Sequence, residues 1–409
     1  MTTGEMIGAQ KARCPVEDEV GATFHQWLGD RSVYWNKERN AWIVTGYAES
    51  ARILEESGTF WRDIAQRDGA SEFWGRHLLV MEGRDHRRMH AVHMQLTGEK
   101  FAEDMRERAR EIARDLSARL AKKGRADLAA DYADAAVFMI GCDFLGIDIT
   151  NTSMMENLLG EMKIRAKWKE ELHAGDGIPF SAQIAQDGKA AIERMASVLL
   201  PIIRERRDHP REDLISALWK KGPSVFPDWN ERDVMSTIWS SMDNETKPLL
   251  RGLMYTLCRD QELQARVRRD PSLIAGFVEE GLRFLTPFRT IRRVVKQEVE
   301  IGGQKMRAGD NIYLITPLAN RDEERWACPH AFDAERKQDS THFAFGYGPG
   351  YCVGRYVGRV EAQEVVGAML AETASFSLDP QYPKPEWAGE MYHSIMPVHA
   401  ILQPPARSS

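Results

Sequence analysis

The segment FAFGYGPGYCVGR, residues 343–355, sets one cysteine in a loop with few side chains. Four glycines surround Cys352: Gly346, Gly348, Gly350 and Gly354. Glycine lets a backbone bend sharply and lets a flat, bulky partner approach without a side-chain collision. The next residues, GRYVGRVEAQEVVGAMLAE, favour a helix, so we expect the sulfur near a helix N-terminus. The helix dipole and the unpaired N–H groups at such an end stabilise a thiolate.

Cys352 in this setting has two interpretations. A thiolate in a glycine-lined cradle is suited to be the fifth ligand of a haem iron, where its electron donation favours O–O cleavage. Alternatively, Cys352 is an ordinary buried cysteine after a glycine-rich turn, which is the more frequent outcome for an isolated cysteine. The rest of the chain decides between them.

The composition is that of a globular chain. Of its 409 residues, 43% are hydrophobic and 28% are charged, which is enough to bury a large core. The sequence shows no linker, low-complexity block or internal repeat, so we expect residues 1–409 to form a single domain. The net charge is −6 with both signs interspersed, which argues against nucleic acid as the main partner.

The sequence carries no targeting or membrane signal that we can identify. Residues 1–21 lack the apolar segment of a signal peptide, and no run reaches the roughly 18 apolar residues that a membrane span needs. We therefore expect a soluble, cytoplasmic protein without a membrane partner. The five cysteines are scattered and lack CxxC spacing, which argues against a disulfide framework or a zinc knuckle.

The hydrophobic pattern predicts far more helix than strand. Alternation over residues 33–47 and 298–316 predicts two hairpins. Amphipathic stretches predict long helices over residues 100–123, 126–147, 184–207, 231–262 and 355–372. The expected fold class is mostly α with a small β-rich region.

The cysteine loop resembles the haem-binding signature of the cytochrome P450 superfamily. That signature reads Phe-Gly-x-Gly, then a basic residue, then x-Cys-x-Gly, and the matching residues here are Phe345, Gly346, Gly348, Cys352 and Gly354. The following helix carries Arg359 and Glu361 where the family usually has Ala-Arg-x-Glu. The family's basic residue two positions before the cysteine, which contacts a haem propionate, is Gly350 in this chain. That contact is missing or is supplied from elsewhere.

A second block lies upstream of the loop. FVEEGLRFLTPF contains Glu280 and Arg283, an i,i+3 pair that can form an ion pair on one helix face. This spacing is common, and alone it indicates a surface salt bridge of little value. In the family, however, the pair joins an arginine from the segment before the haem loop, and ANRDEERWACPHAFDAER supplies Arg336. The resemblance implies a structural triad of Glu280, Arg283 and Arg336 with no part in the chemistry.

A third block, MEGRDHRRMH, resembles the family's His-x-x-x-Arg segment, which reaches the propionates. His86 takes the first position, and His90 replaces the arginine as a weaker, pH-sensitive partner. A surface position on the helix fits His90 equally well. Arg293 stands where the family has a further propionate arginine. The cofactor-binding residues implied by the resemblance are His86, His90, Arg293, Phe345, Gly346, Cys352 and Gly354.

Residues 233–257 are expected to form the long helix that crosses the distal haem face. They carry the family's acid-alcohol pair as Glu245 and Thr246. Reductive activation of dioxygen needs two protons, and a carboxyl and a hydroxyl beside a widened helix turn can order water and relay them. Thr246 would position the oxygen, and Glu245 would connect it with solvent. The alternative is a solvated Glu-Thr pair, but the apolar residues around it predict a buried helix.

The residues around this pair depart from the family. Met242 and Asp243 stand where a small Ala-Gly normally gives dioxygen room, and Pro248 follows Thr246. A proline at 248 cannot donate to the carbonyl oxygen of Asn244, and its ring pushes that turn apart. Our hypothesis is that Pro248 restores the oxygen groove that Asp243 would otherwise close.

The family's substrate pocket is lined from several segments, and here they supply aromatic and charged residues. The candidates are Trp61, Arg62, Trp74, Trp239, Met242, Asp243, Phe288, Arg289 and Met396. The aromatic residues indicate a compact aromatic or polycyclic substrate, unless they are simply core. A substrate carboxylate on Arg289 and an amine or hydroxyl on Asp243 would suit a polar, amino-acid-like or phenolic substrate, unless these side chains face solvent or pair internally.

The resemblance covers nearly the whole chain. It implies a bacterial, soluble haem-thiolate monooxygenase with a large helical domain and a minor β domain around a buried haem. The cofactor would be haem b, iron protoporphyrin IX, and the co-substrate would be O2. The chain has no flavin or nicotinamide fingerprint, so electrons would come from NAD(P)H through a reductase and a ferredoxin or flavodoxin. A basic patch of Arg355 with Arg84, Arg87 and Arg88 would steer an acidic donor, although each arginine alone is equally a solvated residue.

The expected reaction is hydroxylation or O-dealkylation of a small organic substrate, as in secondary metabolism. Glu245 and Thr246 favour it over a peroxide-driven peroxygenase or a haem isomerase-dehydratase, which would usually dispense with such a pair. Nitration or oxidative coupling would use the same residues. A non-enzymatic haem sensor, the remaining alternative, would bind CO without electron-dependent turnover.

Overall fold

Amphipathic periodicity accounts for the helices, which make up most of the chain. The computed structural model describes residues 19–62, 76–79, 81–173, 181–242, 246–337, 341–389 and 392–405. The longer helices are α6 (Gly83–Leu96), α7 (Glu99–Lys123), α8 (Ala135–Leu145), α9 (Thr152–His173), α10 (Ala182–Asp208), α12 (Glu231–Met242), α13 (Thr246–Arg259), α15 (Ile274–Leu285) and α17 (Arg355–Glu372). The shorter ones are α2 (Glu19–Ala22), α3 (Tyr47–Glu55), α11 (Leu214–Lys221), α14 (Gln261–Arg269) and α16 (Thr316–Ala319).

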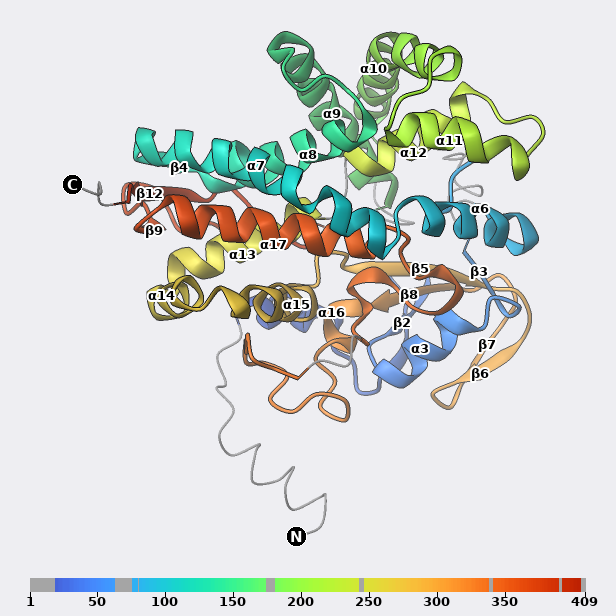
Figure 1. Ribbon diagram of the computed structural model, residues 1–409. Helices are drawn as coiled ribbons and strands as arrows, with labels where there is room; N and C mark the ends of the chain where they lie inside the picture. Colours follow the sequence, from blue (N-terminus) through green and yellow to red (C-terminus); the bar gives the residue numbers. More distant parts are fainter. Residues whose placement is uncertain are drawn as a thin grey trace.

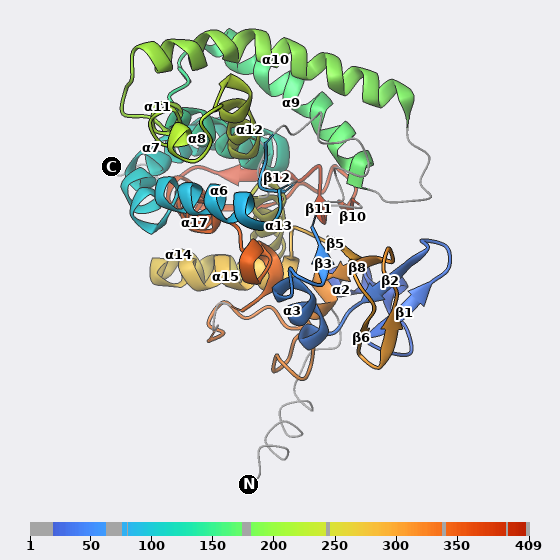
Figure 2. The ribbon, with the colours of Figure 1, turned by 90° about the vertical axis from the view of Figure 1, so that its right-hand side faces the viewer.

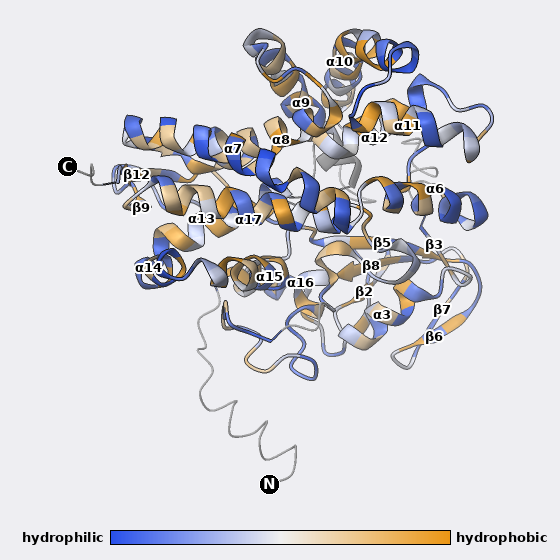
Figure 3. Ribbon diagram, in the orientation of Figure 1, coloured by the Kyte–Doolittle hydropathy of each residue, from blue (hydrophilic) through white to orange (hydrophobic). Residues whose placement is uncertain are grey.

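α7 illustrates how the sequence specifies such a helix. Its buried apolar side chains recur at helical spacing: Ala102, Met105, Ala109, Ile112, Ala113, Leu116 and Leu120. Gly124 follows in the left-handed region, with φ 73°, and ends the helix. Hydrophilic and hydrophobic residues both occur along α7 and α17, as Figure 3 shows. The two helices lie side by side in Figures 1 and 2, so their apolar faces can bury one another.

The strands form one larger sheet and three small ones. They are β1 (Val33–Asn36), β2 (Ala41–Val44), β3 (Phe60–Trp61), β4 (Arg125–Asp127), β5 (Thr290–Val295), β6 (Val299–Ile301), β7 (Gln304–Met306), β8 (Asn311–Ile315), β9 (Ser375–Leu378), β10 (Trp387–Ala388), β11 (Ser394–Ile395) and β12 (His399–Gln403). The larger sheet has the order β1-β2-β8-β5-β3, in which only β2 and β8 run parallel. The others are β4-β12-β9, β10-β11 and β6-β7.

The helical part and the larger sheet occupy different sides of the molecule. Figures 1 and 2 show α9 and α10 at the top, far from the sheet, with α6, α7 and α17 between them. The segment that carries Cys352 contacts α3 through Gly348 and α6 through Tyr351 before it enters α17. The mostly α fold with a small β-rich region is therefore confirmed.

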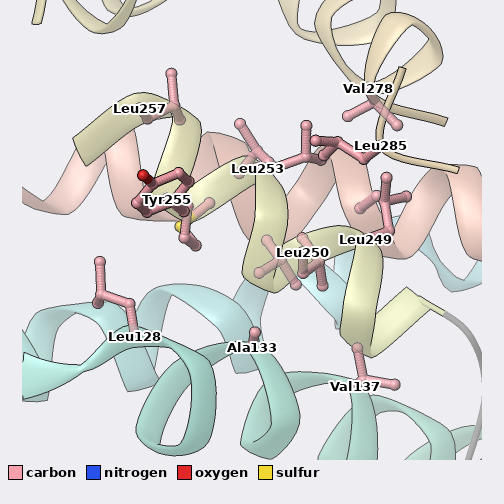
Figure 4. Close-up of a cluster of buried hydrophobic side chains, with 14 of the residues drawn as sticks. Leu128, Ala133, Val137, Leu249, Leu250, Leu253, Tyr255, Leu257, Val278 and Leu285 are labelled. Carbon is pink, nitrogen blue, oxygen red and sulfur yellow. The ribbon is translucent and has the colours of Figure 1, made fainter. Parts of the chain in front are cut away.

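The main apolar core lies around α13. Figure 4 shows Leu249, Leu250 and Leu253 of this helix between side chains of α15 and the segment that leads into α8. Val278 and Leu285 contact it from the α15 side. A second core joins α6, α8, α10 and α12, and a third lies beneath the larger sheet. The cysteine loop contributes to two of these cores, with Ala344 in the first and Phe343 in the third.

Several local predictions hold, and others need correction. The hairpin over 33–47 forms as β1 and β2, and the predicted helices over 100–123, 184–207 and 355–372 match α7, α10 and α17. The helix expected over 126–147 was wrong at its start, where β4 and a π-helix (η2, Leu128–Asp134) precede α8. The stretch 231–262 was expected as one helix but is described as α12 and α13, with 243–245 outside the described residues.

Two further sequence expectations concern membranes and cysteines. Among the residues that the structure describes, no helix combines the length and apolarity that crossing a bilayer requires. Cys142, Cys258 and Cys352 are not disulfide-bonded, whereas Cys328 is, which the scattered spacing of the cysteines did not predict.

The packing of α15 yields a stability prediction. A Cβ on Gly276 would collide with the carbonyl oxygen of Ala334, whereas a Cβ on Gly160 in α9 meets nothing within 4 Å. Gly276→Ala should therefore cost about 1–3 kcal/mol, as overpacking against fixed backbone does. Gly160→Ala should be neutral or stabilise by up to about 1 kcal/mol, because alanine is the better helix former. Denaturant unfolding of both variants checks this, and equal effects would contradict it.

Candidate functional site

Cys352 lies between a short 3-10 turn (η6, Gly348–Gly350) and the first residue of α17. Its backbone N–H donates to the carbonyl oxygen of Phe345 over 2.9 Å, which closes the loop. Gly348 has φ 63°, and a Cβ there would stand 3.0 Å from the carbonyl oxygen of Leu54, so only glycine lets the loop pack closely on α3. Gly354 is the N-cap of α17. The half-buried Cys352 thiol therefore lies at a helix N-terminus, as expected from the sequence.

α6 holds the cysteine loop at two points. Nε2 of His90 lies 2.8 Å from the carbonyl oxygen of Tyr351, and the hydroxyl of Thr97 donates to the carbonyl oxygen of Val353 over 3.2 Å. These carbonyls flank Cys352, so α6 fixes the backbone on both sides of the sulfur. The expected role of His90 toward a propionate stays a prediction. One ring nitrogen of His90 is engaged by the loop backbone.

A positively charged cluster lies beside the loop. It consists of His86 on α6, Arg293 on β5 and Arg62, which follows β3; Nη1 of Arg62 contacts Nε2 of His86. Burial, and then the charge of Arg62, lower the pKa of His86 to about 3, so its imidazole is neutral at physiological pH. Burial, and then the charge of Arg62, lower the pKa of Arg293 to about 9. Arg293 keeps some exposed surface.

The structure brings the three residues of the expected triad together. Glu280 binds Arg283 through two N–H···O bonds of 2.7 and 2.9 Å, and Nε of Arg336 lies 3.1 Å from the same carboxylate. Neither Glu280 nor Arg283 has exposed side-chain surface. Arg283 also donates to the carbonyl oxygens of Asn320 and Pro329, both at 2.9 Å. The triad thus joins α15 to the segment that leads to the cysteine loop.

Sequence reasoning missed a second network on the adjacent residue. Glu279 accepts two N–H···O bonds of 2.7 Å from Arg359 on α17, and Nε2 of His342 lies 3.0 Å from one of its oxygens. Nδ1 of His342 accepts from the N–H of Ala344 over 3.3 Å, so the network reaches the start of the loop. In the sequence, the two consecutive glutamates, Glu279 and Glu280, could have indicated this second network. Neighbouring helix residues point about 100° apart, so each carboxylate needs its own partner.

Comparison with known proteins shows which family the chain resembles. Residues 253–388 match the family model described as Cytochrome P450. The 6-deoxyerythronolide B hydroxylase of Saccharopolyspora erythraea is 27% identical, over 83% of this chain and 84% of that protein. The mycinamicin IV hydroxylase/epoxidase of Micromonospora griseorubida is 26% identical over 86% of both. The crystal structure of HmtT, involved in himastatin biosynthesis, superposes with a TM-score of 0.81 at 24% identity, covering 93% of this chain and 97% of that one.

Over more than four fifths of its length the chain is thus similar to cytochrome P450s. It is a P450 monooxygenase, and the family implies haem iron as the cofactor. The residues described above fit that group. Cys352 offers a soft sulfur donor at the end of a helix, and the guanidinium groups of Arg62 and Arg293 are suited to carboxylates.

Thr246, of the expected acid-alcohol pair, is buried at the start of α13 in this P450. Its Oγ1 lies 3.2 Å from the point where a Cβ on Gly358 would stand, and the ring of Phe345 lies 3.6 Å from that point. The Thr246 hydroxyl and the signature phenylalanine therefore both face Gly358 of α17. Glu245 lies outside the described residues. Pro248 is in the first turn of α13, where its missing N–H has no intrahelical partner to lose, so its effect on the preceding turn stays a prediction.

The candidate pocket residues of the P450 do not all lie together. Trp239 and Met242 are buried on α12, among apolar side chains of α6, α8 and α10. Trp61 and Met396 are 46% and 50% exposed, so they lie at the surface. Phe288 is half-buried against the larger sheet. Two candidates lie outside the described residues: Trp74 and Asp243.

Two charged pocket candidates have partners that the sequence did not indicate. Nη1 of Arg289 donates to the carbonyl oxygen of Gly389 over 2.5 Å, and its guanidinium lies 5.5 Å and 5.7 Å from the ring centroids of Phe24 and Trp27. These contacts are internal, and the expected role of Arg289 toward a substrate carboxylate stays a prediction. Arg62 contacts His86 in the positively charged cluster, and its expected place in the substrate pocket stays a prediction.

The Glu279 network of this P450 predicts a pH effect. Burial alone would raise the pKa of Glu279, but hydrogen bonds from Arg359 and His342 outweigh it and lower the pKa to about 2. A depressed carboxyl pKa stabilises the fold above the unfolded-state pKa and ceases to do so as pH falls toward the folded value. The stability advantage of wild type over Glu279→Gln should therefore shrink by about 1 kcal/mol between about pH 6 and about pH 3.5.

Denaturant unfolding at several pH values measures this advantage. Glu56→Gln, which removes an exposed ion pair with Arg52, controls for the loss of one surface carboxylate. An advantage of wild type over Glu279→Gln that is constant with pH would contradict the prediction.

Proposed function

We propose that this P450 is a haem-thiolate monooxygenase that hydroxylates a small organic substrate. One observation carries the proposal: the Cys352 thiol lies at the N-terminal end of α17, with its backbone held on both sides by α6. The hydroxylase names of two relatives support oxygen insertion as the reaction. A substrate C–H bond, O2, two electrons and two protons then yield an alcohol and water.

The cofactor would be haem b. When bound, it supplies the redox-active iron on which the reduction of O2 depends. Cys352 would donate the axial sulfur. Neutral His86 offers one N–H donor, and Arg293 offers a guanidinium, and both are suited to hold a propionate. Phe345 and Gly346 would shape the loop so that the sulfur faces the iron.

Thr246 and Glu245 would handle the protons of the reaction. A buried hydroxyl holds a proton at a fixed position, and Thr246 is buried with its hydroxyl facing Gly358 of α17. A carboxyl at position 245 would receive protons from solvent and pass them to that hydroxyl. Glu280, Arg283 and Arg336 would take no part in this transfer, because they bind one another and backbone carbonyls within the fold.

The expected substrate pocket would be apolar and aromatic. Trp239 and Met242 are buried on α12, close to the acid-alcohol pair in the chain, and they favour a compact hydrophobic substrate. The internal contacts of Arg289 remove the main support for a substrate carboxylate. Asp243 remains the candidate for a substrate amine or hydroxyl, and a cationic substrate analogue that binds wild type and Asp243→Asn equally would contradict that role.

Electrons would come from NAD(P)H through a reductase and a separate ferredoxin or flavodoxin. The exposed arginines of α6 support an acidic donor: Arg84, Arg87 and Arg88. α6 also bonds the cysteine loop directly, so a donor bound on these arginines would lie close to the haem edge.

The axial ligand is tested by the absorption spectrum of the reduced, CO-bound protein. Wild type should show the red-shifted Soret band of thiolate-ligated haem, and Cys352→Ser should lose it because a serine oxygen does not replace the thiolate. Cys258→Ser is the matched control, since Cys258 is a buried cysteine in α13 that is not disulfide-bonded, and it should keep the band. Wild-type protein that folds without this band would overturn the proposal.

The donor site is tested by charge reversal. Arg84→Glu with Arg87→Glu should slow the first electron transfer from an acidic ferredoxin about tenfold at low salt, because electrostatic steering is lost. The difference should disappear at high salt, where surface charges are screened. Lys122→Glu, an exposed position at the far end of α7, provides the control and should have little effect. Equal slowing by both changes would argue against an α6 docking site.

A further inference from the structure

We propose that Arg62 supplies, from the strand region, the cofactor-binding guanidinium that is missing at Gly350, and that Arg62 and Arg293 together hold the haem carboxylates. This inference rests on the proposed function, because it takes haem as the cofactor. It assigns Arg62 a role different from the substrate contact expected from the sequence.

The register of the larger sheet sets Arg62 against Arg293. β3 and β5 are antiparallel, with Phe60 opposite Val295 and Trp61 opposite Val294. Continuing this register by one residue brings Arg62 opposite Arg293. Directly opposite residues of an antiparallel pair point to the same face of the sheet, so both guanidinium groups face the same side.

Arg62 also fills the space beside Gly350. A Cβ on Gly350 would stand 2.8 Å from Cζ of Arg62 and closer still to Nη2. The backbone of Gly350 is outside the left-handed region, so its conformation does not require glycine. Space is therefore the reason for glycine at this position. Any side chain at 350 would have to displace the Arg62 guanidinium.

The charges around this point call for an anion. Burial lowers the pKa of Arg62, and burial with the charge of Arg62 lowers the pKa of Arg293. The imidazole of His86 is neutral, so it does not offset the positive charge of the two arginines. Glu82 faces the cluster, but one of its oxygens accepts from the backbone N–H of Arg62 over 2.5 Å and the other pairs with Lys296 at 3.2 Å.

Two opposed guanidinium groups repel each other unless an anion lies between them. The haem carries two carboxylates, and each arginine presents a planar fork of N–H donors that binds a carboxylate with two parallel hydrogen bonds. Two arginines facing one side of the sheet therefore match the two propionates in number, charge and geometry. Neutral His86, in contact with Arg62, orients the guanidinium and leaves its charge undiminished.

A residue swap tests the assignment. Haem loss is measured as the rate of transfer to excess apomyoglobin, followed by the Soret absorbance. Arg62→Ala should raise this rate about tenfold or more, as expected for the loss of charge-assisted hydrogen bonds. Arg62→Ala combined with Gly350→Arg should return the rate towards wild type, because the guanidinium is then supplied from the loop. Gly350→Arg alone should not slow haem loss, because two guanidinium groups would compete for one space.

Two further variants keep the test decisive. Arg62→Lys keeps the charge without the planar fork, and should give an intermediate rate. Arg52→Ala removes an exposed arginine on α3 that pairs with Glu56, and should leave the rate unchanged. The inference is wrong if Arg62→Ala and Arg62→Lys both lose haem at the wild-type rate. It is also wrong if the double variant, folded by circular dichroism, loses haem as fast as Arg62→Ala.

The CO spectrum separates this outcome from failure of the proposed function. If wild type lacks the thiolate-type band, haem-thiolate ligation itself fails, whatever the rates of haem loss. If wild type and Arg62→Ala share the band and the rate of haem loss, only the role of Arg62 fails.

Discussion

The described fold depends on one buried carboxylate, that of Glu280. Burying an ion costs several kcal/mol, and the cost is offset only when opposite charge and hydrogen bonds surround it completely. Here Arg283 and Arg336 provide the charge, and the backbone N–H of Asp333 donates over 3.0 Å. Arg283 in turn binds backbone carbonyls of the segment that follows α16. A stretch with little regular structure thus gains a defined conformation from a single buried charge.

The side chain of Asn320 links this segment to the cysteine loop. Oδ1 of Asn320 accepts the N–H of Phe343 over 2.8 Å, and Nδ2 donates to the hydroxyl of Thr286 over 3.0 Å. Glu279, one residue before Glu280, binds Arg359 in the helix that follows the loop. Adjacent carboxylates of one helix therefore fix the chain before and after the cysteine. The position of the sulfur relative to α15 follows from both.

The sequence predicted the features that depend on local order and missed those that depend on tertiary partners. The periodicities that gave α7, α10 and α17 lie within single segments, and the spacing of Glu280 and Arg283 lies on one helix face. Arg289 was assigned to substrate because a charged residue in a pocket-lining strand suggests a ligand. Its partner is a carbonyl 100 residues away, which no local pattern indicates. The start of α8 was misplaced for a similar reason, since β4 forms by pairing with β12 near the C-terminus.

The exchange between Gly350 and Arg62 illustrates why a signature can lose a residue and keep its chemistry. The two haem carboxylates require positive charge at a particular position. Which segment of the chain supplies the arginine matters less. When the guanidinium comes from beside β3, its position is set by the same strand register that sets Arg293. α6 then contacts both parts of the site, Arg62 through His86 and the loop through His90. The charged cluster thereby depends on sheet register and one helix, and the loop is left to position the sulfur alone.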